Sequence, residues 1–158
     1  MRKRSKYRPK GVFLNPVAYV LEGMTPVAQH SNFLIDLKIR NHMAMKSLTQ
    51  GQATRADMDD IIAMGNAVEA LYRMGFGKDY DQVVADGIHA ILSVARRGAA
   101  NGNRFILSAP EMNALNNMME LHDAQMEIIT VRDMENAMKL MQKEWAMGKM
   151  THIVRTKP

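Results

Sequence analysis

The chain has 158 residues, of which 47% are hydrophobic, and a formal net charge of +5 at pH 7. A chain of this length suits one domain with an ordinary core, and this apolar content excludes wholesale disorder. The chain contains no cysteine, which excludes disulfides, thiolate metal sites and cysteine nucleophiles, and this composition fits a reducing cytoplasm.

The start of the chain is positively charged, but it does not have the form of a secretory signal. Asn15, Pro16 and Glu22 interrupt the apolar run that follows the charges, so no hydrophobic region can form there. No other apolar run approaches the roughly 20 residues that a membrane helix needs. We therefore expect a cytoplasmic protein without a membrane partner.

The positive charge is concentrated at the N-terminus. Six of the first ten residues are basic, whereas the first acidic residue is Glu22. The rest of the chain holds 15 basic and 16 acidic side chains, a net charge of −1. We expect residues 1–15 to form an extended basic arm, residues 16–148 a helical domain, and residues 149–158 a basic tail.

The first two predicted helices follow the arm. A short helix is expected from Pro16 to Gly23, because proline suits a first helical turn and glycine a helix end. A longer helix is expected next, with Ser31 or Asn32 as its cap and Gly51 as its stop. Its apolar face is formed by Leu34, Leu37, Ala44, Met45 and Leu48.

The third predicted helix starts at Thr54. Asp57 lies three residues further on and gives an approximate capping box, in which aspartate replaces the usual glutamate. The glycines of residues 75–77 end this helix. Its apolar positions recur at spacings of three and four: Met58, Ile61, Ile62, Gly65, Val68 and Tyr72.

The fourth predicted helix is capped by Asp79 and ends in the loop of residues 98–103, which is rich in glycine and asparagine. Residues 105–107 are a short apolar link. Ser108 and Glu111 then form the strongest helix-start signal in the chain, with Pro110 in the first turn. The apolar stripe of this fifth helix contains Leu115, Met119, Met126 and Ile129, with His122 among them.

Thr130 and Asp133 restart or continue the helix, and a regular stripe follows: Met134, Met138, Met141 and Trp145. No alternation typical of a strand lasts long enough to found a sheet. We therefore predict an all-α fold, a single compact bundle or orthogonal array of five or six helices with the basic arm attached.

Several stretches resemble a set of small proteins encoded by temperate phages and prophages of Proteobacteria. They are RKRSKYRPKGVFLNPVAYVLEG, LIDLKIRNHMAM, LTQGQATRADMDDIIAM and NRFILSAPEMNALNNMMELHDAQMEIITVRDMENA. The likeness covers most of the chain, from residue 1 to about residue 147. It implies expression inside an infected bacterium, where phages commonly use small proteins to regulate DNA or to disable host factors, and it assigns no role to individual residues.

The basic arm is the main candidate site for nucleic acid. Its charges can neutralise several phosphates without sequence preference, and an aromatic side chain among them can stack on a base. Two alternatives remain, an acidic protein surface as the partner, which includes the acidic helix start of this chain, or a solubilising tail. The candidate residues in the arm are Arg2, Lys3, Arg4, Lys6, Tyr7, Arg8 and Lys10.

Arg96, Arg97 and Arg104 surround the loop after the fourth helix and are lesser candidates for phosphate contact. Arginine at a helix C-terminus is also ordinary dipole chemistry, so a structural role is the alternative. A helix-turn-helix at residues 48–64 is rejected, because Asp57, Asp59 and Asp60 would meet the phosphates where a recognition helix enters the groove.

Metal, cofactor and enzyme hypotheses find little support. Asp86 and His89 have helical ligand spacing but stand alone, whereas metal sites in helical bundles need further carboxylates. No phosphate-cradling loop is present, because GFGK at residues 75–78 has the wrong spacing. We therefore predict no metal, no cofactor and no catalytic residues.

Methionine makes up sixteen of the residues, and most of them are predicted to fill the core. Met118 and Met119 are neighbours, so Met118 is expected to point away from the face that Met119 shares with Leu115. Met141 and Met147 lie on different sides of the last helix. With Trp145 and Met118, they are candidates for an adaptable patch that binds a host protein or a second copy of the chain.

Two functional hypotheses follow. The first is a non-enzymatic accessory or regulatory protein whose basic arm contacts nucleic acid or machinery bound to it. The second is an inhibitor or adaptor that binds a host protein through the methionine-rich C-terminal helices.

Overall fold

The computed structural model describes residues 21–148. Residues 21–23 are helical, and the rest of the helix expected from Pro16 lies outside the described residues, as do the arm and the tail. Within the described range, β-structure is limited to one isolated bridge between Pro26 and Thr130. The predicted all-α fold of five or six helices is thus confirmed. The main elements are η1 (Val27–Gln29), α2 (Ser31–Thr49), α3 (Arg55–Arg73), η2 (Lys78–Tyr80), α4 (Asp81–Ala100), α5 (Ala109–Ile128) and α6 (Val131–Ala146).

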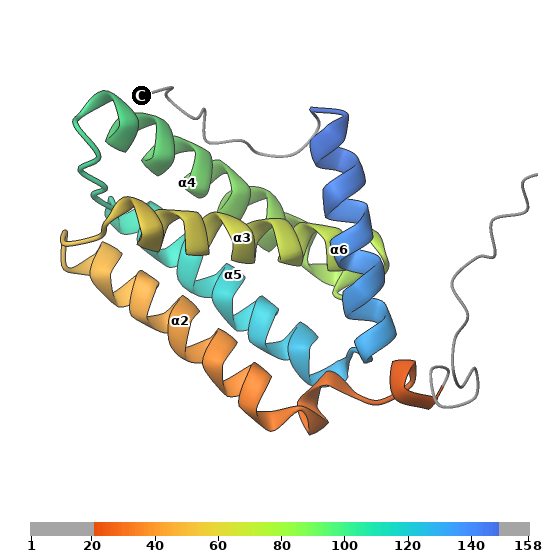
Figure 1. Cartoon of the computed structure of the whole chain (residues 1–158). Helices are drawn as coiled ribbons and strands as arrows, with labels where there is room; N and C mark the ends of the chain where they lie inside the picture. Colours follow the sequence, from red (N-terminus) through yellow and green to blue (C-terminus); the bar gives the residue numbers. More distant parts are fainter. Residues whose placement is uncertain (1–20, 149–158) are drawn as a thin grey trace, which may run out of the picture.

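Four of the helices form the body of the fold. Figure 1 shows α2, α3, α4 and α5 running side by side along one long direction, while α6 crosses them at one end. Short loops join the consecutive helices, which is typical of an antiparallel bundle. α6 packs mainly against α3, and Arg73 Nη1 of α3 donates to Glu144 Oε2 of α6 at 3.1 Å.

Three helices begin at the predicted capping boxes. In α3, α5 and α6 the hydroxyls of Thr54, Ser108 and Thr130 each accept from the backbone N–H three residues further on. The acidic side chain at that third position accepts from the cap's own backbone N–H, at 2.7 Å in α3, 2.8 Å in α5 and 2.9 Å in α6. Each box satisfies backbone donors that have no partner inside the helix.

Two predicted caps were wrong. Ser31 is the first residue of α2, and the cap position belongs to His30, which makes no side-chain cap hydrogen bond. α4 begins at Asp81, after Tyr80, because the 3-10 turn η2 takes up the residues around Asp79. Gly77, with φ of 89°, places the chain into this turn in a conformation that favours glycine.

The buried residues form two apolar clusters. The larger lies among α2, α3, α4 and α5, and the smaller joins η1 and the C-terminal ends of α3 and α5 to α6. Gln125 is buried at the C-terminal end of α5, where its Nε2 donates to the carbonyl of Phe76 at 3.0 Å and to that of Val68 at 3.3 Å. This amide fixes α5 against the end of α3.

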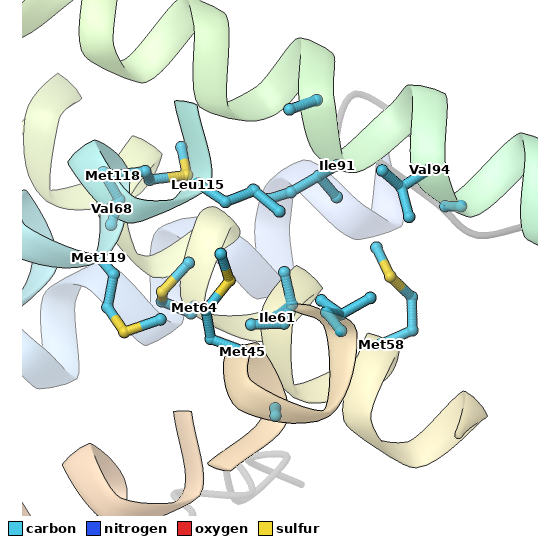
Figure 2. Close-up of a cluster of buried hydrophobic side chains, with 14 of the residues drawn as sticks. Met45, Met58, Ile61, Met64, Val68, Ile91, Val94, Leu115, Met118 and Met119 are labelled. Carbon is cyan, nitrogen blue, oxygen red and sulfur yellow. The ribbon is translucent and has the colours of Figure 1, made fainter. Parts of the chain in front are cut away.

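The prediction that Met118 belongs to a partner-binding patch is wrong, because both Met118 and Met119 are buried. Figure 2 shows Met119 on the side of Met45 and Met64, while Met118 lies on the side of α4. Gly87 of α4 makes room for it, since a Cβ at Gly87 would lie 2.6 Å from Met118 Sδ. α5 therefore has neighbours on both sides, and neighbouring methionines can both enter the core.

Candidate interaction surfaces

The arm residues predicted to contact nucleic acid lie outside the described residues. They are Arg2, Lys3, Arg4, Lys6, Tyr7, Arg8 and Lys10. The described part of the chain, residues 21–148, holds 12 basic and 16 acidic side chains and has a net charge of −4. The helical body is thus acidic, and the excess of positive charge belongs to the two ends of the sequence.

The guanidinium of Arg97 is held by hydrogen bonds to neighbouring residues. Its guanidinium donates through Nη1 to Glu111 Oε1 at 2.9 Å and through Nη2 to Glu111 Oε2 at 2.7 Å. Nη2 also donates to the carbonyl oxygen of Ile106 at 2.6 Å. Arg97 thereby joins the end of α4, the link of residues 105–107 and the first turn of α5.

Glu111 is the acceptor at the centre of this junction. Besides Arg97, it accepts from Ser93 Oγ at 2.8 Å and from the backbone N–H of Ser108 at 2.8 Å. The Arg97 hydrogen bond, with help from Ser108 and Ser93, lowers the pKa of Glu111 to about 2 although partial burial acts in the opposite direction. The carboxylate therefore neutralises Arg97. These contacts favour a structural role for Arg97 over contact with phosphate.

Arg96 and Arg104 differ from Arg97 because no carboxylate of residues 21–148 pairs with them. Both side chains are exposed, and neither forms an ion pair with another residue of the range 21–148. Arg96 lies in the last turns of α4, and Arg104 follows the loop of residues 101–103. Their two charges remain available to an anionic partner at this end of the bundle.

The predicted partner-binding residues divide by position. Met118 is excluded because it is fully buried between α5 and α4. Met141 is half-buried against the smaller apolar cluster. Trp145 and Met138, by contrast, are 65% and 50% exposed on α6, and Met147 is exposed just beyond the end of this helix. Of the four predicted partner-binding residues, only Trp145 and Met147, at the C-terminal end of α6 and just beyond it, are exposed.

α2 carries a second apolar stripe, which was not predicted from the sequence. Ile35, Ile39 and Met43 are all exposed, and their spacing of four residues places them along one side of the helix. The buried positions of α2, such as Ala44 and Leu48, lie on the opposite side. The spacing was present in the sequence, but the Leu34–Leu48 stripe already accounted for a buried face.

Two of the three aspartates that argued against a helix-turn-helix have structural contacts. Asp57 completes the cap of α3, and Asp60 Oδ1 lies 3.7 Å from Arg40 Nε of α2. Asp59 is exposed. An acidic helix start of this kind is stabilised by the helix dipole and repels phosphate.

Among residues 21–148, no three His, Asp or Glu side chains come together in a way that could hold a metal ion. None of the described helices is both long enough and apolar enough to cross a bilayer.

Comparison with known proteins gives no further assignment. No family model matches the chain, and neither a curated protein nor a solved structure matches it significantly.

Proposed function

We propose that this chain is a non-enzymatic accessory protein of the phage type that contacts nucleic acid, or machinery bound to nucleic acid, through its basic N-terminal arm. It would act in the cytoplasm of a host bacterium. The helical body is the scaffold, and the contact is to phosphates rather than to base edges, so it has no sequence preference.

The observation that carries this proposal is the separation of charge. The first ten residues hold six basic side chains and no acid, whereas residues 21–148 have a net charge of −4. A polyanion is attracted to the arm and repelled by most of the body, so binding is confined to the N-terminus and to neighbouring basic residues.

Arg96 and Arg104 are the secondary contacts in this proposal, because they are exposed and have no ion-pair partner in the described part of the chain. Arg97 is not among these phosphate contacts, because Glu111 accepts two hydrogen bonds from its guanidinium. The basic tail, with Lys149, Arg155 and Lys157, adds charge of the same sign.

The test compares two variants that lose the same charge. In one, Arg2, Lys3 and Arg4 are changed to glutamine; in the other, the exposed residues Lys78, Lys139 and Lys143 are changed to glutamine. Affinity for a labelled DNA duplex is measured by fluorescence anisotropy at low salt. The arm variant is expected to bind at least about tenfold more weakly than the native chain, and the body variant within about threefold of it.

Equal weakening in the two variants would contradict the proposal, because binding would then follow net charge and not the arm. Unchanged binding in the arm variant would contradict it as well. It would point to the alternatives, an arm that binds an acidic protein surface or one that only solubilises the chain.

A host protein as partner is the second candidate function. It is favoured by the exposure of Met138, Trp145 and Met147 on and next to α6, because adaptable apolar side chains in solvent are typical of binding surfaces. A second copy of the chain could occupy the same surface.

This second function is tested with nuclease-treated bacterial lysate. The native chain should retain a host protein that a Met138→Lys, Met147→Lys variant does not retain, while the arm variant retains it fully. If nuclease treatment removes every retained protein, the host contact depends on nucleic acid and the second function is wrong. Sedimentation of the purified chain distinguishes self-association.

A further inference from the structure

The outer stripe of α2, formed by Ile35, Ile39 and Met43, is left uncovered by the rest of the described chain. The three side chains are 51%, 52% and 63% exposed. The opposite side of the same helix is buried in the core, for example at Ala44 and Leu48. Apolar residues on both sides are typical of a helix that is covered on both sides. The outer stripe therefore indicates a surface that another helix covers.

α2 lies at one edge of the four-helix body, where it packs mainly against α3 and α5 (Figure 1). Three basic side chains that flank the outer stripe contact carboxylates of these two helices, so their charges are balanced within one chain. The contacts are Lys38 Nζ to Glu127 Oε1 at 3.5 Å, His42 Nε2 to Asp123 Oδ2 at 3.0 Å and Arg40 Nε to Asp60 Oδ1 at 3.7 Å.

Four polar residues share the outer face with the stripe. At 3.6 residues per turn the stripe spans about 80° of the helix circumference, and three of the four lie within this arc, while the fourth lies about 20° beyond it. All four are exposed, and they are Asn32, Lys46 and Gln50 within the arc and Asp36 beside it. Within residues 21–148, neither Asp36 nor Lys46 forms an ion pair.

The order of these residues fits a second copy of the same helix in the antiparallel direction. If the two copies cross at the level of residue 41, near the middle of α2, each residue faces one of complementary character. The facing pairs are Asp36 with Lys46, Ile39 with Met43 and Asn32 with Gln50. Each pair occurs twice, as a two-fold axis requires.

The parallel direction lacks this complementarity. Asp36 would then face Asp36 of the other copy, and Lys46 would face Lys46, so that like charges repel at both ends of the stripe. The charges therefore favour a second, antiparallel copy as the occupant of this face.

We propose that the outer face of α2 is the interface of an antiparallel homodimer. Ile39 and Met43 form its apolar centre, Ile35 extends this centre, and Asp36 and Lys46 set the direction. The interface involves neither the basic arm nor the exposed residues of α6, so it goes beyond the proposed function and does not depend on it.

The apolar centre is tested with two isoleucines of equal exposure. Ile39 on the stripe is 52% exposed, and Ile106 in the link before α5 is 51% exposed. Sedimentation equilibrium of the full chain, purified free of nucleic acid, should show a reversible change from one chain to two as the concentration rises. Ile39→Lys should weaken dimerisation at least about 100-fold, because it places a charge in an apolar contact. Ile106→Lys, the matched control, should stay within about threefold of the native chain.

The direction of the pairing is tested by reversing charges. Asp36→Lys alone and Lys46→Asp alone should each weaken dimerisation about tenfold, because each creates like-charged pairs at both ends of the interface. The double variant Asp36→Lys, Lys46→Asp should return to within about threefold of the native chain, since opposite charges face each other again. All three variants change exposed residues only.

Three results would overturn the proposal. The native chain could remain a monomer up to about 1 mM, a concentration at which even a weak dimer is populated. Ile39→Lys and Ile106→Lys could weaken dimerisation equally, which would place the interface elsewhere. The double charge variant could dimerise as weakly as the single ones, which would contradict the antiparallel pairing.

Discussion

α5 and α6 follow each other in the chain, separated by Ile129 and Thr130, and their sequences look alike. Both begin with a capping box, and both carry methionines at helical spacing. In α5, Met118, Met119 and Met126 are all buried. In α6 the one fully buried residue is Ala137, while Met134 and Met141 are half-buried and Met138 is exposed.

The difference comes from the position of each helix in the fold. α5 packs against α2, α3 and α4, whereas α6 packs mainly against α3. A helix with neighbours on several sides buries apolar residues all round, and a helix at an edge buries one stripe. The spacing of methionines predicts a helix with an apolar face, but the number of neighbours decides how many faces are covered.

Truncation of one methionine in each helix should have very different effects on stability. Met118→Ala removes a fully buried side chain from α5, so we expect it to lower the free energy of unfolding by about 2–5 kcal/mol. Met138→Ala should lower it by less than about 0.5 kcal/mol, because Met138 is half exposed on α6. Urea unfolding of the two variants measures both values, and similar values would contradict the buried position of α5.

The buried position of Met118 in α5 depends on its contact with Gly87 of α4. Gly87→Ala places a methyl group within 2.6 Å of Met118 Sδ, and we expect it to lower the free energy of unfolding by about 1–3 kcal/mol. The double variant Gly87→Ala, Met118→Ala should lose less than the sum of the two single variants, because truncation removes Sδ and Cε, at 2.6 Å and 2.8 Å from the new methyl group, and leaves only the contact with Cβ at 2.9 Å. Additive losses in a double-mutant cycle would mean that the two residues do not share this space.

The capping carboxylates of α5 and α6 differ in the hydrogen bonds that they accept. Glu111 of α5 is held by Arg97, Ser93 and Ser108, whereas the carboxylate of Asp133 in α6 accepts from Thr130. Glu111→Gln is expected to lower the free energy of unfolding by about 2 kcal/mol, because it breaks a charged pair at a largely buried carboxylate. Asp133→Asn should lower it by about 1 kcal/mol, the usual value of a cap.

The cap of α5 also makes the stability of the chain depend on pH. The pKa of Glu111 is lowered from 4.5 to about 2 in the folded chain. Its contribution is therefore complete above about pH 4.5 and is lost as the pH falls toward about 2. Urea unfolding between about pH 2.5 and about pH 6 should show a shallower decline for Glu111→Gln than for the native chain, and an unchanged decline would contradict the role of Arg97.

The parts of the fold that the sequence predicted correctly depend on neighbours in the chain. The boxes at Thr54, Ser108 and Thr130 each need only four consecutive residues, and all three are present. The wrong cap at Asp79 has the same origin, since nothing in the local pattern reveals that η2 precedes α4.

The parts that failed depend on residues distant in sequence. Met118 is buried because Gly87, thirty-one positions earlier, lacks a side chain. Arg97 resembles an ordinary basic residue at a helix end until Glu111 is placed opposite it. Asn41 and His122 are eighty-one positions apart, and both polar side chains are buried once α2 and α5 pack together.

The central functional claim is that the basic arm, and not the acidic body, binds polyanions. The most direct measurement is the dependence of DNA affinity on salt concentration, for the native chain and for the variant with Arg2, Lys3 and Arg4 changed to glutamine. If each arm cation neutralises one phosphate, the slope of log K against log salt concentration should be about −5 for the native chain and about −3 for the variant. Equal slopes, or an affinity that does not change with salt concentration, would contradict the claim.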